Sequence, residues 1–437
     1  MHTRQSKMRV FTTLLAILPV LFPGSLRAQE SRDTTETPTQ QISLRDYLAV
    51  VELGNPDLAA QRSTVSIAEA QRRVARLLPN PVTSLSYSSD RTGHQMPTTI
   101  GTGLTQTVLL GGKVSARSAV ADHTYDATVE QYRDFGRTLR ATAASAYVDA
   151  IVAELGAERR RLSSEAMEKL TAATQARFRA GDIGEVDFLQ ARVELLQFRG
   201  DQIAAEETRR AALLALSLLM GKQRTDTLFI PTPYQQIPPR HFALASLIDS
   251  ALAQRPDVIA ARRAADAAKA GIRLAKANRV SDIDVGVGYV RNEQSKNAIA
   301  PSQGWGALGV SLSFALPFSN VVNHGDFDVA TYTFEQADRA RISAEVRAEN
   351  DVRQAHGYYE LTVARLALYS DELLRDAERV AAARLYSYQR GSAPLTDVLI
   401  AQRALNDVYL AYDDALGEYL KAFIGLRAAI GSSNIDL

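Results

Sequence analysis

The sequence contains no cysteine among its 437 residues. This absence excludes disulfides, thiolate metal sites, a cysteine nucleophile and a lipid anchor on an N-terminal cysteine. An excess of one charge is also missing, because 50 Lys and Arg residues balance 49 Asp and Glu residues. Nucleic-acid-binding proteins usually carry a clear basic excess, so we expect no nucleic-acid partner.

Long apolar runs are missing as well. Beyond residue 28, no stretch approaches the roughly 20 apolar residues of a membrane helix. Residues 1–28 combine basic residues with a short apolar segment, Val10–Leu21, and end on Ala28, which is typical of a secretory signal peptide. The alternative is an uncleaved N-terminal anchor. Residues 29–41 are predicted as a polar linker. The mature chain is therefore expected outside the cytoplasm, either soluble or crossing a membrane as β-strands.

Histidine is scarce, and we find no catalytic constellation. The six histidines show no spacing of two to five residues, which zinc sites usually need. The pairs Gly286-x-Gly288 and Gly304-x-Gly306 do not open a helix that carries Lys-Ser/Thr, so they are not phosphate-binding loops. We therefore expect no enzyme activity, no metal site and no cofactor.

Proline is absent from two long parts of the chain, 98–230 and 318–393. Because proline breaks helices, each part is predicted to form a long helix, a glycine-containing turn and a return helix. These helices are predicted over 113–180 and 185–220, and over 325–390 and 395–429. Apolar residues recur in steps of three and four, as at Leu189, Val193 and Leu196. This spacing favours antiparallel coiled-coil packing, in which one seam faces a neighbouring helix. The alternative is the buried face of a monomeric bundle.

The chain has two similar halves. Asn55-Pro56-Asp57-Leu58 recurs as Arg255-Pro256-Asp257-Val258, and the turn at Gly181 matches the turn at Gly391. We predict two structural repeats, 42–240 and 241–437. Each repeat begins with an outer helix, followed by two strands and the two helices described above.

The strands are predicted over 82–110 and 283–316, two in each segment. Apolar residues there alternate with small or polar residues, which is typical of transmembrane β-strands. Tyr289 and Trp305 are predicted as anchors at the membrane interface. The alternative is a small soluble sheet packed on the bundle. The fold class is therefore mainly α with a small β part: long antiparallel coiled-coil helices plus four transmembrane β-strands per chain.

These features together resemble the TolC-like outer-membrane factor family over essentially the whole mature chain. The motifs that carry the resemblance are the two Pro-Asp motifs, the two glycine turns followed by Asp-x-Leu, Gly103–Lys113 and Gly309–Phe318. The resemblance implies a homotrimeric α/β-barrel channel with a twelve-stranded barrel among outer-membrane lipids and a twelve-helix tunnel in the periplasm. It also implies two partners, a periplasmic adaptor protein and an inner-membrane transporter of the RND type.

Short motifs are similar to the heavy-metal cation efflux branch of that family. They are Leu77–Pro81, Leu110–Lys113 and Asn323–Gly325. The resemblance therefore implies a passive exit duct from the periplasm to the exterior for metal cations or small toxic compounds. Drug or protein export is the alternative cargo. A soluble periplasmic coiled-coil scaffold or adaptor is the alternative function.

The resemblance also implies a closed entrance at the glycine turns. Asp397 is predicted to line an aperture ring, and Asp187 and Tyr388 to join a hydrogen-bond network that holds it shut. The family's basic partner near the second turn is replaced here by Ala393, so Arg390 is the candidate substitute. The alternative role for both aspartates is stabilisation of a helix N-terminus. The residues predicted to dock the adaptor are Gly181, Asp182 and Ile183 at the first turn, and Gly391, Ser392, Pro394 and Leu395 at the second.

Overall fold

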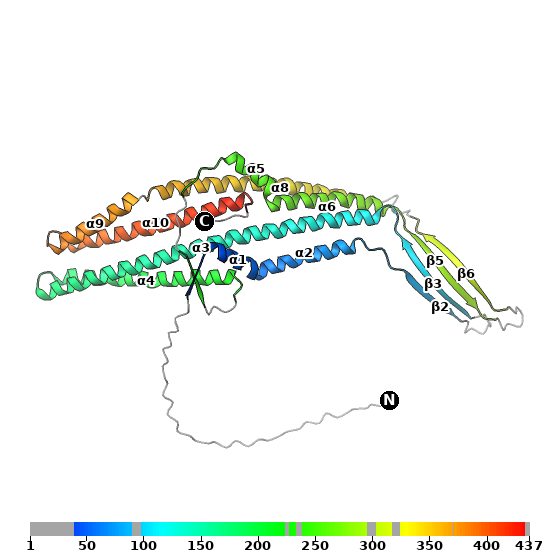
Figure 1. Ribbon diagram of the computed structural model, residues 1–437, viewed down its shortest axis with the longest axis horizontal. Coiled ribbons are helices and arrows are strands. Elements are labelled where there is room, and N and C mark those ends of the chain that lie inside the picture. The colour runs from blue at the N-terminus through cyan, green and yellow to red at the C-terminus, as the bar shows by residue number, and fades with distance from the viewer. Residues whose placement is uncertain are drawn as a thin grey trace, which may run out of the picture. The chain divides into compact units, whose positions relative to one another are not determined.

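The computed structural model describes residues 39–89, 98–222, 227–232, 238–294, 303–316, 324–369 and 371–432 (Figure 1). The predicted signal peptide, and the linker up to residue 38, lie outside these residues. The helices are α1 (Leu44–Gly54), α2 (Pro56–Val74), α3 (Lys113–Ala180), α4 (Glu185–Leu219), α5 (Leu244–Gln254), α6 (Pro256–Asn278), α8 (Gly325–Ala367), α9 (Asp371–Gln389) and α10 (Leu395–Ala429). The strands are β1 (Thr39–Ile42), β2 (Val82–Ser88), β3 (Thr99–Val108), β4 (Leu228–Pro231), β5 (Ile283–Asn292) and β6 (Trp305–Phe314).

Helix α3 is continuous over 68 residues, and its bounds coincide with the range expected from the proline-free run. The predicted helix over 325–390 is different, because it is divided into α8 and α9. Helix α8 ends at Ala367, and α9 begins at Asp371. The sequence Ser370-Asp371-Glu372 is typical of a helix start, since acidic residues in a first turn complement the helix dipole. The prediction of one long helix used only the positions of proline and therefore did not include this helix start.

The two Pro-Asp motifs fold in the same way. The Asn55 side chain caps α2 and donates to the backbone oxygen of Leu219, near the end of α4, at 3.0 Å. Arg255 occupies the matching place before α6 and donates to the backbone oxygen of Ala429, at the end of α10, at 3.2 Å. Each motif therefore satisfies an unpaired carbonyl at the C-terminus of a return helix. This shared joint explains why the motif occurs in both halves.

The main apolar core lies around these joints, where helices of both halves meet. Tyr47 of α1 packs on Tyr147 of α3 with ring centroids 5.7 Å apart, and Tyr359 of α8 packs on Tyr419 of α10 at 5.9 Å. Strands β1 and β4 pair in parallel beside this core. Thr39 and the next two residues belong to β1, so the predicted linker ends before residue 39 rather than at residue 41.

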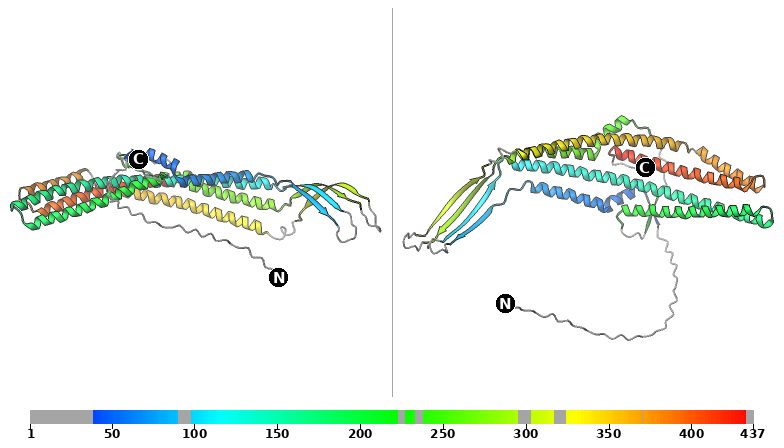
Figure 2. Two further views of the ribbon diagram at one scale, coloured as in Figure 1. Left: turned by 90° about the horizontal axis from the view of Figure 1, so that it is seen from below. Right: turned by 180° about the vertical axis from the view of Figure 1, so that it is seen from behind.

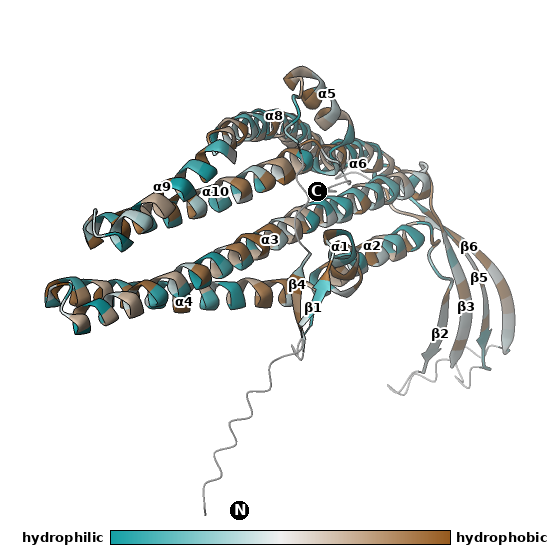
Figure 3. Cartoon of the chain, turned by 60° about the vertical axis from the view of Figure 1, so that its left-hand side comes forward, coloured by the Kyte–Doolittle hydropathy of each residue, from teal (hydrophilic) through white to brown (hydrophobic). Residues whose placement is uncertain are grey.

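Strands β2, β3, β5 and β6 form a second sheet in that order, with antiparallel neighbours throughout. The register places most of the apolar side chains on one face. That face carries Leu85, Tyr87, Ile100, Leu104, Val108, Ile283, Val285, Val287, Tyr289, Leu308, Val310, Leu312 and Phe314. The alternation shows as bands of colour along the strands in Figure 3.

The opposite face of this sheet carries mostly glycine, serine and threonine, together with a few larger side chains such as Val290. Its packing differs along the strands: a Cβ atom added to Gly286 would lie 2.4 Å from the Ser311 hydroxyl oxygen, whereas one added to Gly309 would meet no atom within 4 Å. Tyr289 lies on the apolar face, as an interface anchor requires. Trp305 pairs with Asn292 and lies on the small-residue face, so its predicted role as a lipid-facing anchor is wrong. The register, rather than residue type, decides which way each ring points.

The sheet and the hairpin turns lie at opposite ends of the helices (Figures 1 and 2). Strand β3 leads directly into the start of α3, whereas the Gly181 turn follows its end. A helix of 68 residues separates them by about 100 Å at 1.5 Å per residue. Among the described residues, no helix combines the length and apolar character that crossing a bilayer requires.

Candidate functional site

The two hairpin tips have nearly identical backbone turns. Gly181 ends α3 with a φ of 81°, and Gly391 follows α9 with a φ of 74°. At the first tip, the N–H groups of Gly181 and Asp182 donate to the carbonyls of Phe178 and Arg177. Gly391 and Ser392 repeat this pattern at the second tip. Both turns are Schellman motifs, in which glycine adopts the left-handed conformation without a Cβ penalty.

Most of the predicted docking residues are accessible. Asp182, Ser392 and Pro394 are exposed, and Ile183 is half-buried. Leu395 is different, because its side chain is only 2% exposed. It packs beneath the second tip, so it supports the turn rather than presenting a surface to a partner.

A small apolar cluster underlies both tips and joins the two hairpins. It contains Met167, Leu170, Ala191, Phe198, Tyr388, Leu395, Val398 and Leu399. Arg177 of α3 donates to the backbone oxygen of Tyr388 at 3.3 Å, and its guanidinium lies 4.9 Å from the centroid of the Tyr388 ring. Tyr388 therefore connects the α3/α4 hairpin with the α9/α10 hairpin.

The structure does not bring the four predicted aperture residues together into one network. The Tyr388 hydroxyl is buried, and it has no hydrogen-bond partner among the described residues. Asp187 is half-buried in the first turn of α4 and forms no side-chain hydrogen bond or ion pair within the described parts of the chain. Its placement suits a carboxylate that stabilises a helix N-terminus.

Asp397 has a partner that the sequence did not indicate. Arg384 of α9 donates to the Asp397 carboxylate at 3.2 Å. Arg390 instead lies over the ring of Tyr386, with its guanidinium 4.5 Å from the centroid. Arg390 therefore does not replace the missing basic partner within one chain. Arg384 and Asp397 are 13 residues apart on different helices, a separation at which sequence spacing predicts no contact.

A polar link between the hairpins was also missed. Glu194 of α4 is 5% exposed, and both of its carboxylate oxygens accept hydrogen bonds from the guanidinium of Arg403 on α10. Arg403 also donates to the Gln197 side chain at 3.0 Å. The Glu194 carboxylate keeps the pKa of Arg403 above its ordinary value. A charged residue between the buried Ala191 and Phe198 was the signal that could have revealed this pair.

The heptad seam predicted on α4 does not face α3. Leu189, Val193, Leu196 and Ile203 are 44%, 56%, 58% and 69% exposed in the single chain. The side chains of α4 that are buried belong to another stripe, which includes Phe198. One chain therefore leaves a heptad-spaced apolar stripe on α4 uncovered.

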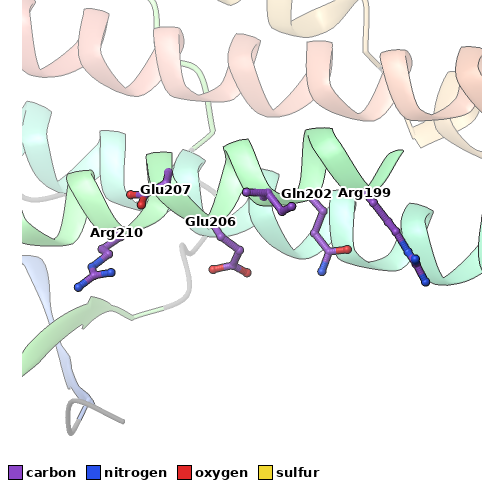
Figure 4. A pocket seen from close by; sticks show the side chains of 6 residues that line it. Arg199, Gln202, Glu206, Glu207 and Arg210 are labelled. Atoms are coloured by element: carbon purple, nitrogen blue, oxygen red, sulfur yellow. The ribbon is translucent and has the colours of Figure 1, made fainter. Parts of the chain in front are cut away.

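An open hollow along α4 includes Ile203 from this stripe. Its other lining side chains are charged or carry an amide, and all of them come from α4 itself (Figure 4). Arg199, one of these residues, pairs with Glu168 of α3 at 2.6 Å. The hollow is therefore a feature of the surface of one hairpin, without the converging groups of an active site.

Across the described residues, no three His, Asp or Glu side chains gather in a way that could hold a metal ion. The expectation that the chain has no metal site, cofactor or catalysis stays a prediction.

Comparison with known proteins agrees with this architecture. The family model for outer membrane efflux proteins matches residues 49–222 and 247–432. The cobalt-zinc-cadmium resistance protein CzcC of Cupriavidus metallidurans is 22% identical over 432 residues, which cover 97% of this chain and 99% of that protein. The outer membrane protein TolC of Vibrio cholerae is 23% identical over 316 residues, which cover 71% of this chain and 70% of that protein.

Among solved structures, that of CusC superposes with a TM-score of 0.72 at 19% identity, and the match covers 93% of this chain and 96% of CusC. The crystal structures of CusC show conformational changes that accompany folding and transmembrane channel formation. The family model spans both halves of the chain, including the hairpin tips and the sheet. The chain therefore belongs to the outer membrane efflux protein family.

Proposed function

We propose that this chain is the passive outer-membrane exit duct of a tripartite efflux system and that its cargo is metal cations. The choice of metal cations as cargo rests on one observation. The sequence is similar, over nearly the full length of both chains, to a protein named for cobalt, zinc and cadmium resistance. Members of the family are channel components, so the duct makes and breaks no bond. The duct functions by opening and closing.

Three copies would form the duct. The apolar stripe of Leu189, Val193, Leu196 and Ile203 is exposed in one chain, and such a stripe is stabilised when a neighbouring copy covers it. Strands β2 and β6 are the outer strands of their sheet in the single chain. Unpaired strand edges are ready to pair with another chain, so β2 of one copy would lie beside β6 of the next.

The hairpin tips would dock a periplasmic adaptor, which in turn would connect the duct to an RND-type transporter in the inner membrane. This assignment rests on the exposed turn residues Asp182, Ser392 and Pro394 and on the distance between the tips and the sheet. Ile183 contributes a partly exposed apolar contact, whereas Gly181 and Gly391 shape the turns. Leu395 would act indirectly, by holding the second turn from below.

The gate would lie just behind the tips. Asp397, held by Arg384, would line the aperture. The buried hydroxyl of Tyr388 and the half-buried carboxylate of Asp187 would find partners only when three chains assemble. The Glu194–Arg403 pair would keep the two hairpins together in the closed state. Opening would move the return helices α4 and α10 apart and break this pair.

Absence of native cysteine makes the docking assignment testable by disulfide cross-linking. Single variants Asp182→Cys and Ser392→Cys should form disulfides with cysteines placed in the adaptor. Ser66→Cys, on the exposed surface of α2, is the matched control and should not react. Equal cross-linking of all three variants would refute docking at the tips.

The cargo is tested by removing the chain from its host. Tolerance to Co²⁺, Zn²⁺ and Cd²⁺ should fall and return with the wild-type chain, while tolerance to organic antibiotics should change little. The reverse pattern would refute metal export. Extraction of a trimer from the outer membrane by detergent separates the duct from a soluble scaffold, which would be released by buffer alone.

A further inference from the structure

A groove lies between α3 and α6 where these helices leave the large sheet. It is lined by the Gly111-Gly112 turn, by Ser115 of α3, and by Arg273 and Lys276 of α6, among others. A Cβ atom added to Gly112 would meet no atom within 4 Å, so the groove is open at the turn. Arg273 and Lys276 are both exposed. The groove thus combines open space with two cationic side chains.

The heptad positions of α3 show which side of the helices the groove lies on. Ala119, which also lines the groove, precedes Arg140 and Tyr147 by three and four heptads. Arg140 pairs with Glu52 at 3.0 Å, and Tyr147 packs on Tyr47, so helix α1 covers this face of α3. A tunnel wall has no room for α1 on its inside. The groove therefore lies on the outer face.

Helix α6 leads to the same conclusion. Lys276 lies two heptads after Arg262. Arg262 donates to the backbone oxygen of Leu252 in α5 at 3.1 Å, so α5 lies over the face of α6 that Lys276 shares. Like α1, α5 lies beside the long helices (Figure 1). Arg273 and Lys276 thus point away from the channel.

Two other cations at this end of the helices have carboxylate partners, whereas Arg273 and Lys276 have none among the described residues. Lys113 pairs with Asp282 at 2.7 Å, and Arg72 pairs with Asp122 at 2.5 Å. No carboxylate of the described residues lies within ion-pair distance of Arg273 or Lys276.

Other nearby groups do not neutralise these charges. The Lys276 ammonium lies 5.5 Å from the centroid of the Phe327 ring, a contact that leaves its charge in place. The first turn of α3 contains no acidic residue. Asp326 and Asp328 begin α8 nearby, but neither forms an ion pair with the groove cations. The groove is therefore a positively charged surface that favours the binding of an anion.

The position of the groove relative to the sheet indicates which anion binds there. Val108 on the apolar sheet face lies three residues before Gly111, and Ile283 on the same face lies three residues after Val280, which lines the groove. A membrane that covers the apolar face would place its phosphate layer where the helices begin. Basic residues at that level attract anionic lipids. We propose that the groove binds the phosphate headgroup of an anionic phospholipid and so fixes the depth of the duct in the membrane.

This inference rests on the proposed duct, and the two are tested separately. Recovery of the full-length wild-type chain as a trimer from the outer membrane tests the duct. Titration of that trimer in detergent with short-chain phosphatidylglycerol, read by native mass spectrometry, tests the groove. Phosphatidylcholine and inorganic phosphate are the comparison ligands.

Arg273→Gln with Lys276→Gln should weaken phosphatidylglycerol binding roughly thirtyfold, since each basic residue near an anionic surface contributes roughly fivefold. Arg339→Gln with Arg347→Gln removes two exposed charges from α8, farther from the sheet, and should change binding little. The exchange Arg273→Lys with Lys276→Arg keeps the charge and should retain binding. Equal weakening by both neutralised pairs, equal binding of phosphatidylcholine, or displacement by millimolar inorganic phosphate would overturn the proposal.

Discussion

Replacing Arg403 by glutamine tests whether the Glu194–Arg403 pair holds the hairpins together. The Glu194 side chain is 6% exposed and the Arg403 side chain is 55% exposed. Removing one member of a fully buried ion pair costs about 3–5 kcal/mol, because a buried charge is left without a partner. Water already reaches the Arg403 side, so a lower cost of about 2 kcal/mol is expected. If the pair exists only in the closed state, the ratio of open to closed channels rises about thirtyfold.

The assay is the resting conductance of the purified trimer in planar bilayers. Arg403→Gln should raise the open fraction strongly. Glu194→Gln should have a smaller effect, because it leaves no buried charge. The double variant should open less than the sum of the two single effects, and the cycle then yields the coupling energy of the pair. Arg199→Gln is the matched control, since its partner Glu168 lies in the same hairpin and joins α3 to α4.

Two results would refute this reasoning. If Arg199→Gln opened the channel as much as Arg403→Gln, the effect would come from general loss of charge near the tip. If the single effects were simply additive, the two side chains would not act as a pair. Either result would leave two other links between the hairpins, the apolar cluster around Tyr388 and the ion pair between Arg159 of α3 and Asp413 of α10.

Three further predictions concern the tip, the sheet and the joint between the halves. Gly181→Ala should destabilise the solubilised trimer by about 1 kcal/mol in thermal unfolding, because alanine is strained at a positive φ. The added Cβ atom itself would meet no other atom. An unchanged melting temperature would contradict this prediction. Val310→Lys should reduce the yield of assembled trimer in the outer membrane, since a lysine facing lipid costs about 2–4 kcal/mol near the bilayer centre. The control Gly309→Lys, on the small-residue face, should assemble normally. Equal yields of the two variants would contradict the assignment of the faces. Burial alone would raise the pKa of Asp257, but hydrogen bonds and charge from Arg255 hold that pKa below its ordinary value. The ionised carboxylate therefore stabilises the fold above about pH 4. This stabilisation is lost as the pH falls through the lowered pKa. Asp257→Asn should therefore flatten the stability profile between pH 5 and pH 2, as measured by urea unfolding, and an unchanged slope would show that the pair carries no such linkage.

Local chemistry determined much of this molecule without tertiary information. The extent of α3 follows from the lack of proline, and the ends of the hairpins follow from glycines that tolerate a positive φ. The two faces of the sheet follow from alternation with a period of two. Each of these properties depends on residues that are close in sequence, so the pattern and the structure coincide. The lipid-facing role predicted for Trp305 failed because the register places it on the other face.

Tertiary structure decided the contacts on which the proposed gate depends. The sequence presented Leu189 and Val193 as a seam of α4 without indicating its partner; within one chain, the rotation of the helix buries Ala191, Glu194 and Phe198 and leaves that stripe exposed. Rotation also brings Arg384 to Asp397 and Arg403 to Glu194, whereas Arg390 turns to an aromatic ring. The sequence by itself determined where helices, turns and strands occur, because these depend on local backbone preferences. Only the packed structure decided which side chains meet, because helix rotation is set by the sum of many distant contacts.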